Sequence, residues 1–256
     1  MHPILFRIGS FTIYSYGAML VVALLVVIQG SAYAVRKFPA SLRAISPEQV
    51  VDCCSCSLLG GILGARLFYV ILYWSWFAQA PQSILAIWQG GLVWYGGLFG
   101  GGLAAWLYIR AQRLDGWRVA DQLVPFLTLG HAIGRLGCFL NGCCYGKPTS
   151  SWCGIVFQGQ SVPVLPVQLF ESAGLFALFV FLRALQRPSI LQRPARLFGV
   201  YLVCYATLRF GLEFLRGDQS TWWAGLTLQQ LISLGLCLCG LGLIVRSLNT
   251  RSARKY

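Results

Sequence analysis

Apolar residues run along this chain in long blocks that alternate with short polar segments. Each block is about 20 residues long, the length that a helix needs to cross the hydrocarbon core of a bilayer. The blocks predict seven spans, at about residues 14–35, 50–73, 91–110, 119–138, 167–186, 197–216 and 225–246. We therefore expect an all-α integral membrane protein with seven transmembrane helices.

The composition excludes an ordinary soluble domain. Hydrophobic residues make up 57% of the chain and charged residues only 11%, whereas about a quarter of the residues of a soluble domain are charged. The N-terminal stretch MHPILFRIGSF lacks a basic start followed by a short apolar core and a cleavage site, so we expect no cleaved signal peptide. The first span would then serve as the uncleaved signal for insertion.

Two glycine-rich patches indicate how the helices associate. GGILGA at residues 60–65 and GGLFGGG at residues 96–102 carry small residues, which let helix backbones approach closely in a membrane. This pattern favours one compact bundle, a single transmembrane domain over residues 1–256. The connection at about residues 139–166 is rich in Gly, Pro and Ser, and we expect it to be an irregular outer-side loop with room for a function.

Lysine and arginine are distributed unequally between the two sides of this topology. One side holds only Arg7, Lys147 and Arg216. The alternate segments hold the other basic residues outside the spans: Arg36, Lys37 and Arg43; Arg110, Arg113 and Arg118; Arg183, Arg187, Arg193 and Arg196; Arg246, Arg251, Arg254 and Lys255. The positive-inside rule then places the N-terminus outside and the C-terminus in the cytoplasm.

The net charge of +13 follows from this orientation, because basic cytoplasmic loops face anionic lipid headgroups. These basic residues are spread over short loops, and no recognised nucleic-acid motif accompanies them. We therefore expect the membrane as a partner and no nucleic acid.

Three arginines, Arg66, Arg135 and Arg209, lie inside predicted spans. An arginine there costs at least ~2.5–3.5 kcal/mol, so each needs a partner or a water-filled cavity. One possibility is structural: Arg209 and Glu213 form a satisfied buried pair, while Arg66 and Arg135 bind backbone carbonyl groups. The other is a site for an anion, because three arginines against one glutamate leave an excess of positive charge.

Helical spacing gathers these charges on two faces. Arg209, Glu213 and Arg216 are spaced i, i+4 and i+7, which puts them on one face of a helix. The same spacing recurs in an earlier span, at His131, Arg135 and Cys138. Both faces lie near the outer ends of their spans and predict a hydrophilic cavity open to the outer side. A guanidinium fork matches a phosphate bidentately, and the most abundant phosphate in a membrane is the lipid headgroup.

The polar stretches form a recognisable set of motifs. GRLGCFLNGCCYG (134–146) resembles the signature of the prolipoprotein diacylglyceryl transferase family, Gly-Arg-x-Gly-Asn-Phe-x-Asn-Gly-Glu-x-x-Gly, in a branch with GCF and CCYG forms. The resemblance covers almost the whole chain, through SYG (15–17), ARLFYV (65–70), GGLVWYGGLFGG (90–101), LPVQLFES (165–172), LRFGLEFLRGD (208–218) and GLTLQQLISL (225–234). The signature and the Arg-Glu-Arg stretch together are specific for that family.

The resemblance implies an activity and a location. Members of this family transfer the diacylglyceryl group of phosphatidylglycerol to the lipobox cysteine of a prolipoprotein, which forms a thioether and releases glycerol phosphate in the first step of lipoprotein maturation. The expected partners are phosphatidylglycerol, prolipoprotein signal peptides with a lipobox cysteine, and the membrane. The expected location is the bacterial cytoplasmic (inner) membrane, as a multi-pass protein. We expect no cofactor and no metal ion.

The resemblance also implies site residues. The signature corresponds to Arg135, Asn141 and Gly146, the late motif to Arg209, Glu213 and Arg216, and cavity positions to Tyr16, Arg66, Gln168 and Glu171. Three positions depart from the family's pattern. Cys138 replaces the signature Asn, Cys143 replaces the signature Glu, and Tyr95 replaces the His that usually precedes Gly-Gly-Leu.

The expected chemistry is attack of a thiolate on the glycerol carbon that bears the phosphate. A free thiol has a pKa near 8.5, and positive surroundings lower it, so an arginine-rich cavity would supply thiolate. We expect Arg135 and Arg209 to clamp the phosphate and to stabilise the charge on the leaving group. Glu213 would hold Arg209 or Arg216, and Asn141 would bind the headgroup or the backbone.

The residue that accepts the thiol proton is open between two candidates. Tyr95 stands in place of the usual histidine, as proton acceptor or hydrogen-bond donor, although a phenol that ionises near pH 10 is a poor base. His131 is the second candidate, because its i, i+4 spacing to Arg135 puts it on the cavity face.

The cysteines admit rival functions. Cys53 and Cys56 have CxxC spacing and Cys143 and Cys144 are adjacent, which suits a membrane thiol oxidoreductase. A zinc site is conceivable at four cysteines whose spacing matches no common zinc pattern, Cys138, Cys143, Cys144 and Cys153. Disulfide bonds among them are equally open. A third class is a paralogue that binds or transports anionic lipid without chemistry.

Overall fold

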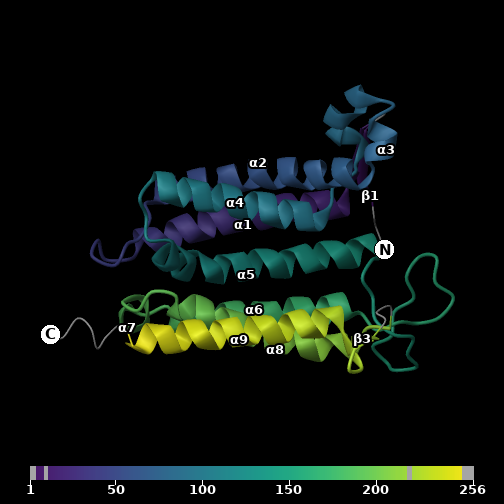
Figure 1. Ribbon diagram of the computed structural model, residues 1–256. Coiled ribbons are helices and arrows are strands. Elements are labelled where there is room, and N and C mark those ends of the chain that lie inside the picture. Colours follow the sequence, from purple (N-terminus) through teal and green to yellow (C-terminus); the bar gives the residue numbers. More distant parts are fainter. Residues whose placement is uncertain (1–3, 9–10, 218–220, 250–256) are drawn as a thin grey trace. The chain divides into compact units, whose positions relative to one another are not determined.

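The computed structural model describes residues 4–8, 11–217 and 221–249, which are mostly helical (Figure 1). These ranges contain seven helices of 18 residues or more, one for each predicted apolar block: α1 (Ser15–Arg36), α2 (Pro47–Leu72), α4 (Trp94–Ala111), α5 (Gly116–Asn141), α6 (Val167–Leu185), α8 (Arg196–Glu213) and α9 (Leu228–Asn249). Helix formation over the seven blocks is therefore confirmed.

Five of these helices are long and apolar enough to cross a bilayer, namely α1, α2, α5, α6 and α9. The chain is therefore an all-α membrane protein, as expected. α4 and α8 have 18 residues each, which at 1.5 Å per residue is about 27 Å of helix. That length is close to the hydrocarbon thickness of about 30 Å, but the two helices are less apolar or more charged than the other five, so their membrane crossing stays a prediction.

Short elements that the apolar pattern did not predict precede the first long helix or connect the others. β1 (Ile4–Ile8) pairs antiparallel with β2 (Phe11–Tyr14), and β3 (Thr221–Trp223) with β4 (Leu226–Thr227). The remaining elements are α3 (Trp74–Phe77), η1 (Pro81–Leu85) and η2 (Ile87–Gln89) before α4, and α7 (Pro188–Leu191) before α8. Two-stranded pairs of this length build no core of their own, so the helices define the fold.

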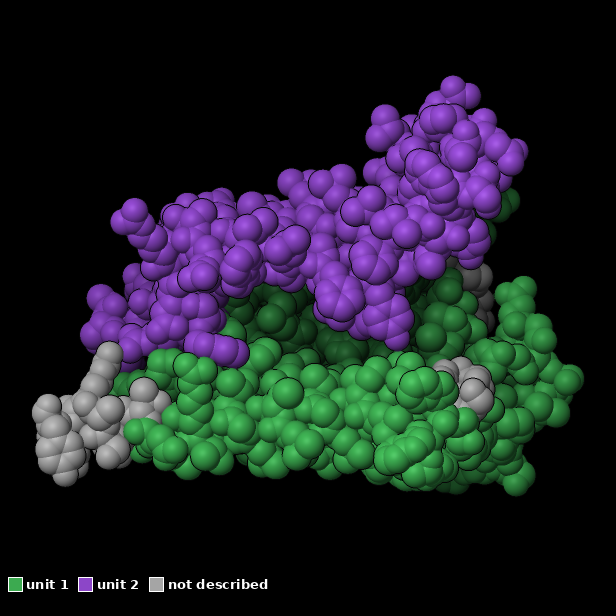
Figure 2. Space-filling model, in the orientation of Figure 1, with its two compact units in different colours: residues 1–31, 120–256 green, residues 32–119 purple. Residues whose placement is uncertain are grey.

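The chain divides into two compact units (Figure 2). Unit 2 comprises residues 32–119, and its α2 and α4 pack through facing glycines. A Cβ atom added at Gly100 would lie 2.3 Å from the carbonyl oxygen of Gly60, and one added at Gly64 would lie 2.4 Å from that of Gly96. The close approach expected from the two glycine-rich patches is thus confirmed. That the two units act as one domain stays a prediction.

Unit 1 comprises residues 1–31 and 120–256, with α5, α6, α8, α9 and most of α1. Within it α8 packs against both α6 and α9 (Figure 1). Glycines bring α1 close to α5, because Gly130 faces Val27 and Gly30 faces the ring of Phe126. A buried cluster fills the space between α5, α6 and α8: Val124, Leu178, Leu182 and Leu197.

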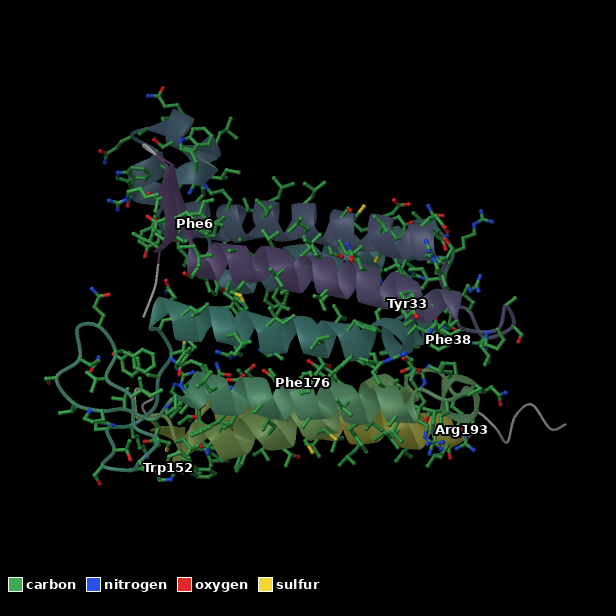
Figure 3. The ribbon with its side chains drawn as sticks, turned by 180° about the vertical axis from the view of Figure 1, so that it is seen from behind. Phe6, Tyr33, Phe38, Trp152, Phe176 and Arg193 are labelled. Atoms are coloured by element: carbon green, nitrogen blue, oxygen red, sulfur yellow. The ribbon has the colours of Figure 1, made fainter. Side chains whose placement is uncertain are left out.

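The connection from α5 to α6 spans residues 142–166. It begins later than the predicted residue 139, because α5 continues to Asn141. The connection is irregular, as expected, and isolated bridges join Val164 to Pro148 and to Ile155. Trp152 projects from it and is 97% exposed (Figure 3).

A buried carboxylate joins α5 to α8. Asp121 is fully buried, and its Oδ1 accepts a hydrogen bond of 2.8 Å from the backbone N–H of Phe198 in the first turn of α8. The same carboxylate interacts with the N–H groups of Arg196 and Leu197. The N-cap residue of α8, Ala195, offers no side-chain cap. Asp121 therefore supplies, from another helix, the negative charge that a helix N-terminus favours.

We expect Asp121→Asn to lower the free energy of unfolding by about 1–2 kcal/mol, because the N-terminus of α8 loses a buried negative charge while the side chain keeps its size. Thermal unfolding in detergent would then show a fall of roughly 2–8 °C. Asp115→Asn is the matched control, because Asp115 caps the exposed start of α5 at the N–H of Trp117, and Asn is an equally good cap. Equal melting temperatures for Asp121→Asn and the wild type would contradict this role.

Candidate functional site

Polar side chains of α5 and α6 meet inside unit 1. Nη2 of Arg135 lies 2.9 Å from Oε1 of Glu171, and Nε2 of His131 lies 3.9 Å from the same oxygen. Only 2% of the Glu171 side chain is exposed. Arg135 is therefore held by a carboxylate from a second helix, and not by backbone carbonyl groups alone.

A second ion pair lies on α8. Nη2 of Arg209 is 2.8 Å from Oε2 of Glu213, and 8% and 0% of the two side chains are exposed. Thr227 Oγ1 donates a hydrogen bond of 2.9 Å to Oε1 of Glu213. The buried pair that the i, i+4 spacing predicted is thus confirmed. Because Arg135 and Arg209 each have their own glutamate, the excess of positive charge is smaller than the sequence suggested.

Apart from the two carboxylate oxygens that form the ion pairs, three buried polar atoms near these pairs have no hydrogen-bond partner among the described residues: Nε of Arg135, Nη1 of Arg209 and Oε1 of Gln168. A buried polar group left without a partner costs about 1–3 kcal/mol. A bound polar ligand or water would remove that cost. The two guanidinium groups therefore retain N–H donors for a ligand that can accept hydrogen bonds.

Aromatic side chains connect the two ion pairs. The ring centroid of Tyr205, on α8, lies 5.6 Å from that of His131. Both side chains interact electrostatically with Arg135 and with Arg209. The ion pairs thus belong to one group, which we call the arginine cluster: His131, Arg135, Glu171, Tyr205, Arg209 and Glu213.

The signature sequence ends α5 in a Schellman motif. Gly142 has φ +74°. Its N–H donates to the carbonyl of Phe139, and the N–H of Cys143 donates to that of Cys138, each at 3.1 Å. This pair of bonds closes a helix around a left-handed residue, which explains the glycine. Gln168 of α6 holds the turn, because its Nε2 donates to the carbonyl of Cys143 at 2.6 Å.

The last signature glycine is required for close packing. The N–H of Gly146 donates to the carbonyl of Leu165 at 2.8 Å. A Cβ atom there would lie 2.5 Å from Val167 and 2.6 Å from the carbonyl oxygen of Leu215. Gly146 therefore lets the chain pass between the start of α6 and the end of α8. Binding of substrate at Gly146 stays a prediction.

Tyr16 and Arg216 complete the predicted residues of unit 1. The ring of Tyr16, on α1, lies 3.3 Å from where a Cβ atom of Gly137 would stand, and Tyr16 interacts electrostatically with Arg135. Arg216 follows α8, and its backbone N–H donates to the carbonyl of Glu213 at 3.1 Å. Predicted site residues from α1, α5, α6 and α8 thus lie in one unit.

Two predicted site residues, Arg66 and Tyr95, lie in unit 2. Arg66 donates hydrogen bonds of 2.5–3.2 Å to four carbonyl oxygens, those of Ser83, Ile84, Gly90 and Gly91. The structural alternative, in which Arg66 binds backbone carbonyl groups, is therefore confirmed. Through these bonds Arg66 orders the segment before α4. Contact of Arg66 with substrate stays a prediction. Tyr95 is the second residue of α4 and is 48% exposed; its ring centroid lies 5.2 Å from that of Trp94.

An apolar groove of about 470 Å³ runs between α5 and α6 in unit 1. Phe176 lines it from α6 (Figure 3). Ser172, also in its lining, donates to the carbonyl of Ala132 at 2.9 Å. The other lining residues are aliphatic: Leu129, Ala132, Ile133, Leu136, Leu169 and Ala173. The same two helices carry Arg135 and Glu171, so apolar and charged surfaces adjoin.

All ten cysteines lie within the described ranges, and all are free thiols. The sulfur atoms of Cys138, Cys143 and Cys144 lie within 4.8 Å of one another, whereas Cys153 is not in this group and contacts Ser151 Oγ at 3.4 Å. The disulfide bonds left open by the sequence are therefore not formed in this structure.

The sequence analysis did not predict the contacts of Thr227 with Gln230 and Glu213. Thr227 exchanges hydrogen bonds with Gln230, Thr227 N–H to Gln230 Oε1 at 3.0 Å and Gln230 N–H to Thr227 Oγ1 at 3.3 Å. This is a capping box at the start of α9, and the spacing Thr-x-x-Gln was a readable signal for it. The contact of Thr227 with Glu213 had no such signal, because it joins separate elements.

Comparison with known proteins gives one consistent result. The chain matches the family model described as prolipoprotein diacylglyceryl transferase over residues 3–246. The phosphatidylglycerol–prolipoprotein diacylglyceryl transferase of Trichormus variabilis is 35% identical over 244 residues, 91% of this chain and 84% of the relative. That of Clostridium tetani is 32% identical over 246 residues, 94% and 96% of the two chains. The enzyme numbered 2 of Clostridium perfringens is 31% identical over 260 residues, 100% and 98% of the two chains.

Proposed function

The chain belongs to the prolipoprotein diacylglyceryl transferase family, and from that premise we infer that it is a phosphatidylglycerol–prolipoprotein diacylglyceryl transferase. It transfers the diacylglyceryl group of phosphatidylglycerol to the lipobox cysteine thiol of a prolipoprotein. A carbon–sulfur bond forms at the glycerol carbon that carried the phosphate, the carbon–oxygen bond breaks, and glycerol phosphate leaves. The arginine cluster supports placing this reaction in unit 1, because it has buried N–H donors without partners.

We assign the phosphate clamp to Arg135 and Arg209. Each guanidinium is oriented by a buried glutamate at 2.8–2.9 Å, which leaves Nε of Arg135 and Nη1 of Arg209 for phosphate oxygens. Because the glutamates neutralise the resting cluster, the clamp does not depend on an uncompensated charge in the membrane. Donors already in place stabilise the negative charge that develops on the leaving phosphate.

Residues around the clamp would bind the remainder of the headgroup. Asn141, Gln168 and Tyr16 flank the end of α5, and the free Oε1 of Gln168 can accept a hydrogen bond from a glycerol hydroxyl. The apolar groove between α5 and α6 suits an acyl chain, because its lining is mainly aliphatic and it adjoins Arg135 on the same helix. Contacts of Arg66, Gly146 and Arg216 with substrate are proposed on the family resemblance alone.

The proton acceptor remains a choice between Tyr95 and His131. His131 belongs to the arginine cluster, 3.9 Å from Glu171, and this contact favours it over Tyr95 as a group near the phosphate. Replacement of either residue by Phe, with the pH dependence of transfer as readout, distinguishes the two.

We propose seven membrane crossings with the N-terminus outside and the C-terminus in the cytoplasm, in a bacterial cytoplasmic (inner) membrane. The distribution of basic residues supports this orientation. Within unit 1, Arg193 and Trp152 lie at opposite ends of the helices (Figure 3), which agrees with a basic cytoplasmic end and an outer loop. Membership of the branch with GCF and CCYG forms is proposed on the signature alone.

The test uses the full chain in detergent with phosphatidylglycerol and a lipobox peptide. The wild type should add a diacylglyceryl group to the peptide, seen as a mass shift, and release glycerol phosphate. We expect Arg135→Gln to transfer about tenfold to hundredfold more slowly, because a charge-assisted hydrogen bond contributes about 1.5–3 kcal/mol. Arg187→Gln is the control, because Arg187 is exposed in the basic loop and its Nε donates to the nearby carbonyl of Ala184.

The outcomes separate the rival functions. Disulfide exchange without a mass shift would support the thiol oxidoreductase. Tight binding of phosphatidylglycerol without product would support the non-catalytic paralogue. Equal loss in Arg135→Gln and Arg187→Gln would contradict the clamp, since a general effect of charge removal would then explain both.

A further inference from the structure

Three cysteine side chains converge at the end of α5, where the mechanism above gives them no task. The sulfur atoms of Cys138, Cys143 and Cys144 lie within 4.8 Å of one another. Neutral thiols are weak hydrogen-bonding groups, and three thiolates at this distance repel one another. Neither form by itself explains the convergence, whereas a cation bound between the sulfur atoms would.

The backbone is shaped to bring the three sulfur atoms together. The Schellman motif around Gly142 returns Cys143 to the last turn of α5, next to Cys138. Cys144 then adopts φ +63°, a left-handed conformation that is unfavourable for a non-glycine residue. Strain of this kind persists where the surrounding structure imposes it, and it gathers at ligand sites.

Neighbouring polar groups orient the cysteines, in the way that groups bonded to metal ligands orient those ligands. The side chain of Asn141 interacts with the side chain of Cys143, and Gln168 Nε2 donates to the carbonyl of Cys143 at 2.6 Å. Arg135 interacts electrostatically with Cys138 and Cys144. Partners of this type orient ligands and tune their basicity, and the arginine offsets the negative charge of several thiolates.

We propose that Cys138, Cys143 and Cys144 form a three-thiolate zinc site whose fourth position takes the lipobox cysteine of the substrate as its thiolate. Zinc binds cysteine sulfur at about 2.3 Å in tetrahedral geometry, which sets the sulfur atoms about 3.8 Å apart. No two of the three sulfur atoms are farther apart than 4.8 Å, which exceeds that spacing by about 1 Å at most. Three protein ligands leave one position open, as in catalytic zinc sites.

Zinc would act within the transfer reaction, so this inference rests on the proposed function. The substrate thiol displaces the water or hydroxide on zinc, and its proton leaves with that group. The zinc-bound sulfur then attacks the glycerol carbon with its electron pair, the carbon–oxygen bond breaks, and glycerol phosphate leaves with the bonding electrons. No oxidant or reductant is needed. Zinc would thus supply the thiolate that an imidazole base would otherwise generate, in a chain with Tyr95 at the histidine position.

Metal content tests the site without reference to activity. The full chain is purified in detergent with a reductant, from cells grown with zinc, and its metals are measured by mass spectrometry. We expect one zinc ion per chain in the wild type and in the control Cys239→Ser, which changes an exposed cysteine outside the group. Cys138→Ser, Cys143→Ser and Cys144→Ser should each lose it. Cobalt in place of zinc should give a thiolate-to-cobalt absorption band in the wild type, which covers the case of variants that fail to fold.

Three results would overturn the site. They are wild-type protein without zinc, copper in its place, or a disulfide bond among Cys138, Cys143 and Cys144 in protein kept under its native redox conditions. Loss of zinc from Cys239→Ser to the same extent as from the other variants would also contradict it.

Measurements of transfer activity then distinguish failure of the zinc site from failure of the proposed function. With a thiol pKa near 8.5, about one thiol in thirty is ionised at pH 7. Removal of zinc by a chelator should therefore slow transfer by up to about thirtyfold, and added zinc should restore it. Full transfer by zinc-free protein would overturn the inference and leave the transferase intact. Bound zinc in a protein without any transfer would contradict the proposed function and leave the metal site.

Discussion

Arg209→Ala is expected to abolish detectable diacylglyceryl transfer, with a loss of at least about 10²–10³-fold. Removing one preorganised donor from a site that stabilises developing negative charge has an effect of this size. The variant also leaves Glu213 buried without its partner, and breaking a buried ion pair in this way costs about 3–5 kcal/mol of stability. Peptide mass and glycerol phosphate release measure the first effect, and thermal unfolding measures the second.

A double variant separates lost chemistry from lost folding. In Arg209→Met/Glu213→Leu both charges of the pair are replaced by apolar side chains, a change that is often neutral or stabilising for a buried pair. We expect this variant to recover the melting temperature while transfer stays absent. Recovery of transfer along with stability would mean that Arg209 has only a structural role, and the phosphate clamp would then be wrong.

Gly100→Ala is expected to destabilise unit 2 by about 1–3 kcal/mol, the usual result of overpacking a close contact. Its Cβ atom would lie 2.3 Å from the carbonyl oxygen of Gly60 and 2.9 Å from Cα of Gly64. Both are backbone atoms, so the overlap can be relieved only if α2 and α4 move apart. The apparent melting temperature in detergent should fall by roughly 2–12 °C.

Gly102→Ala is the matched control on the same helix. A Cβ atom added at Gly102 meets no atom within 4 Å, and alanine is about 1 kcal/mol more favourable than glycine in a helix interior. The melting temperature of this variant should therefore stay equal or rise. If both variants fall equally, helix flexibility rather than close packing would explain the glycines of α4.

The apolar blocks and the helical spacing were sufficient to predict several features of unit 1. The pair of Arg209 and Glu213 depends only on the rise and turn of one helix, so residues four apart must meet. The Schellman turn after Asn141 is also local, since a glycine follows the last helical residue. The sequence did not indicate that α5 would continue to Asn141, because apolar hydropathy declines before the helix ends.

The sequence did not predict which side chains of different helices would pair. Glu171 binds Arg135 from another helix, and Asp121 caps α8 from a distance of 77 residues along the chain. The role of Arg66 also depended on the tertiary structure, because its carbonyl partners lie 17–25 residues away. Each pairing depends on how far one helix is rotated and shifted along another, which a one-dimensional pattern of polar positions does not contain.

The sequence by itself determined the membrane environment, the positions of the long helices, the small residues that permit close helix packing, and the family. These follow from local apolar length, small-residue patterns and motifs, each a property of consecutive residues. Only the tertiary structure decided which carboxylate holds which arginine, and that the sulfur atoms of Cys138, Cys143 and Cys144 converge. The reason is physical: ion pairs and ligand sites require side chains to meet in space, and backbone rotation at the ends of helices decides whether they do.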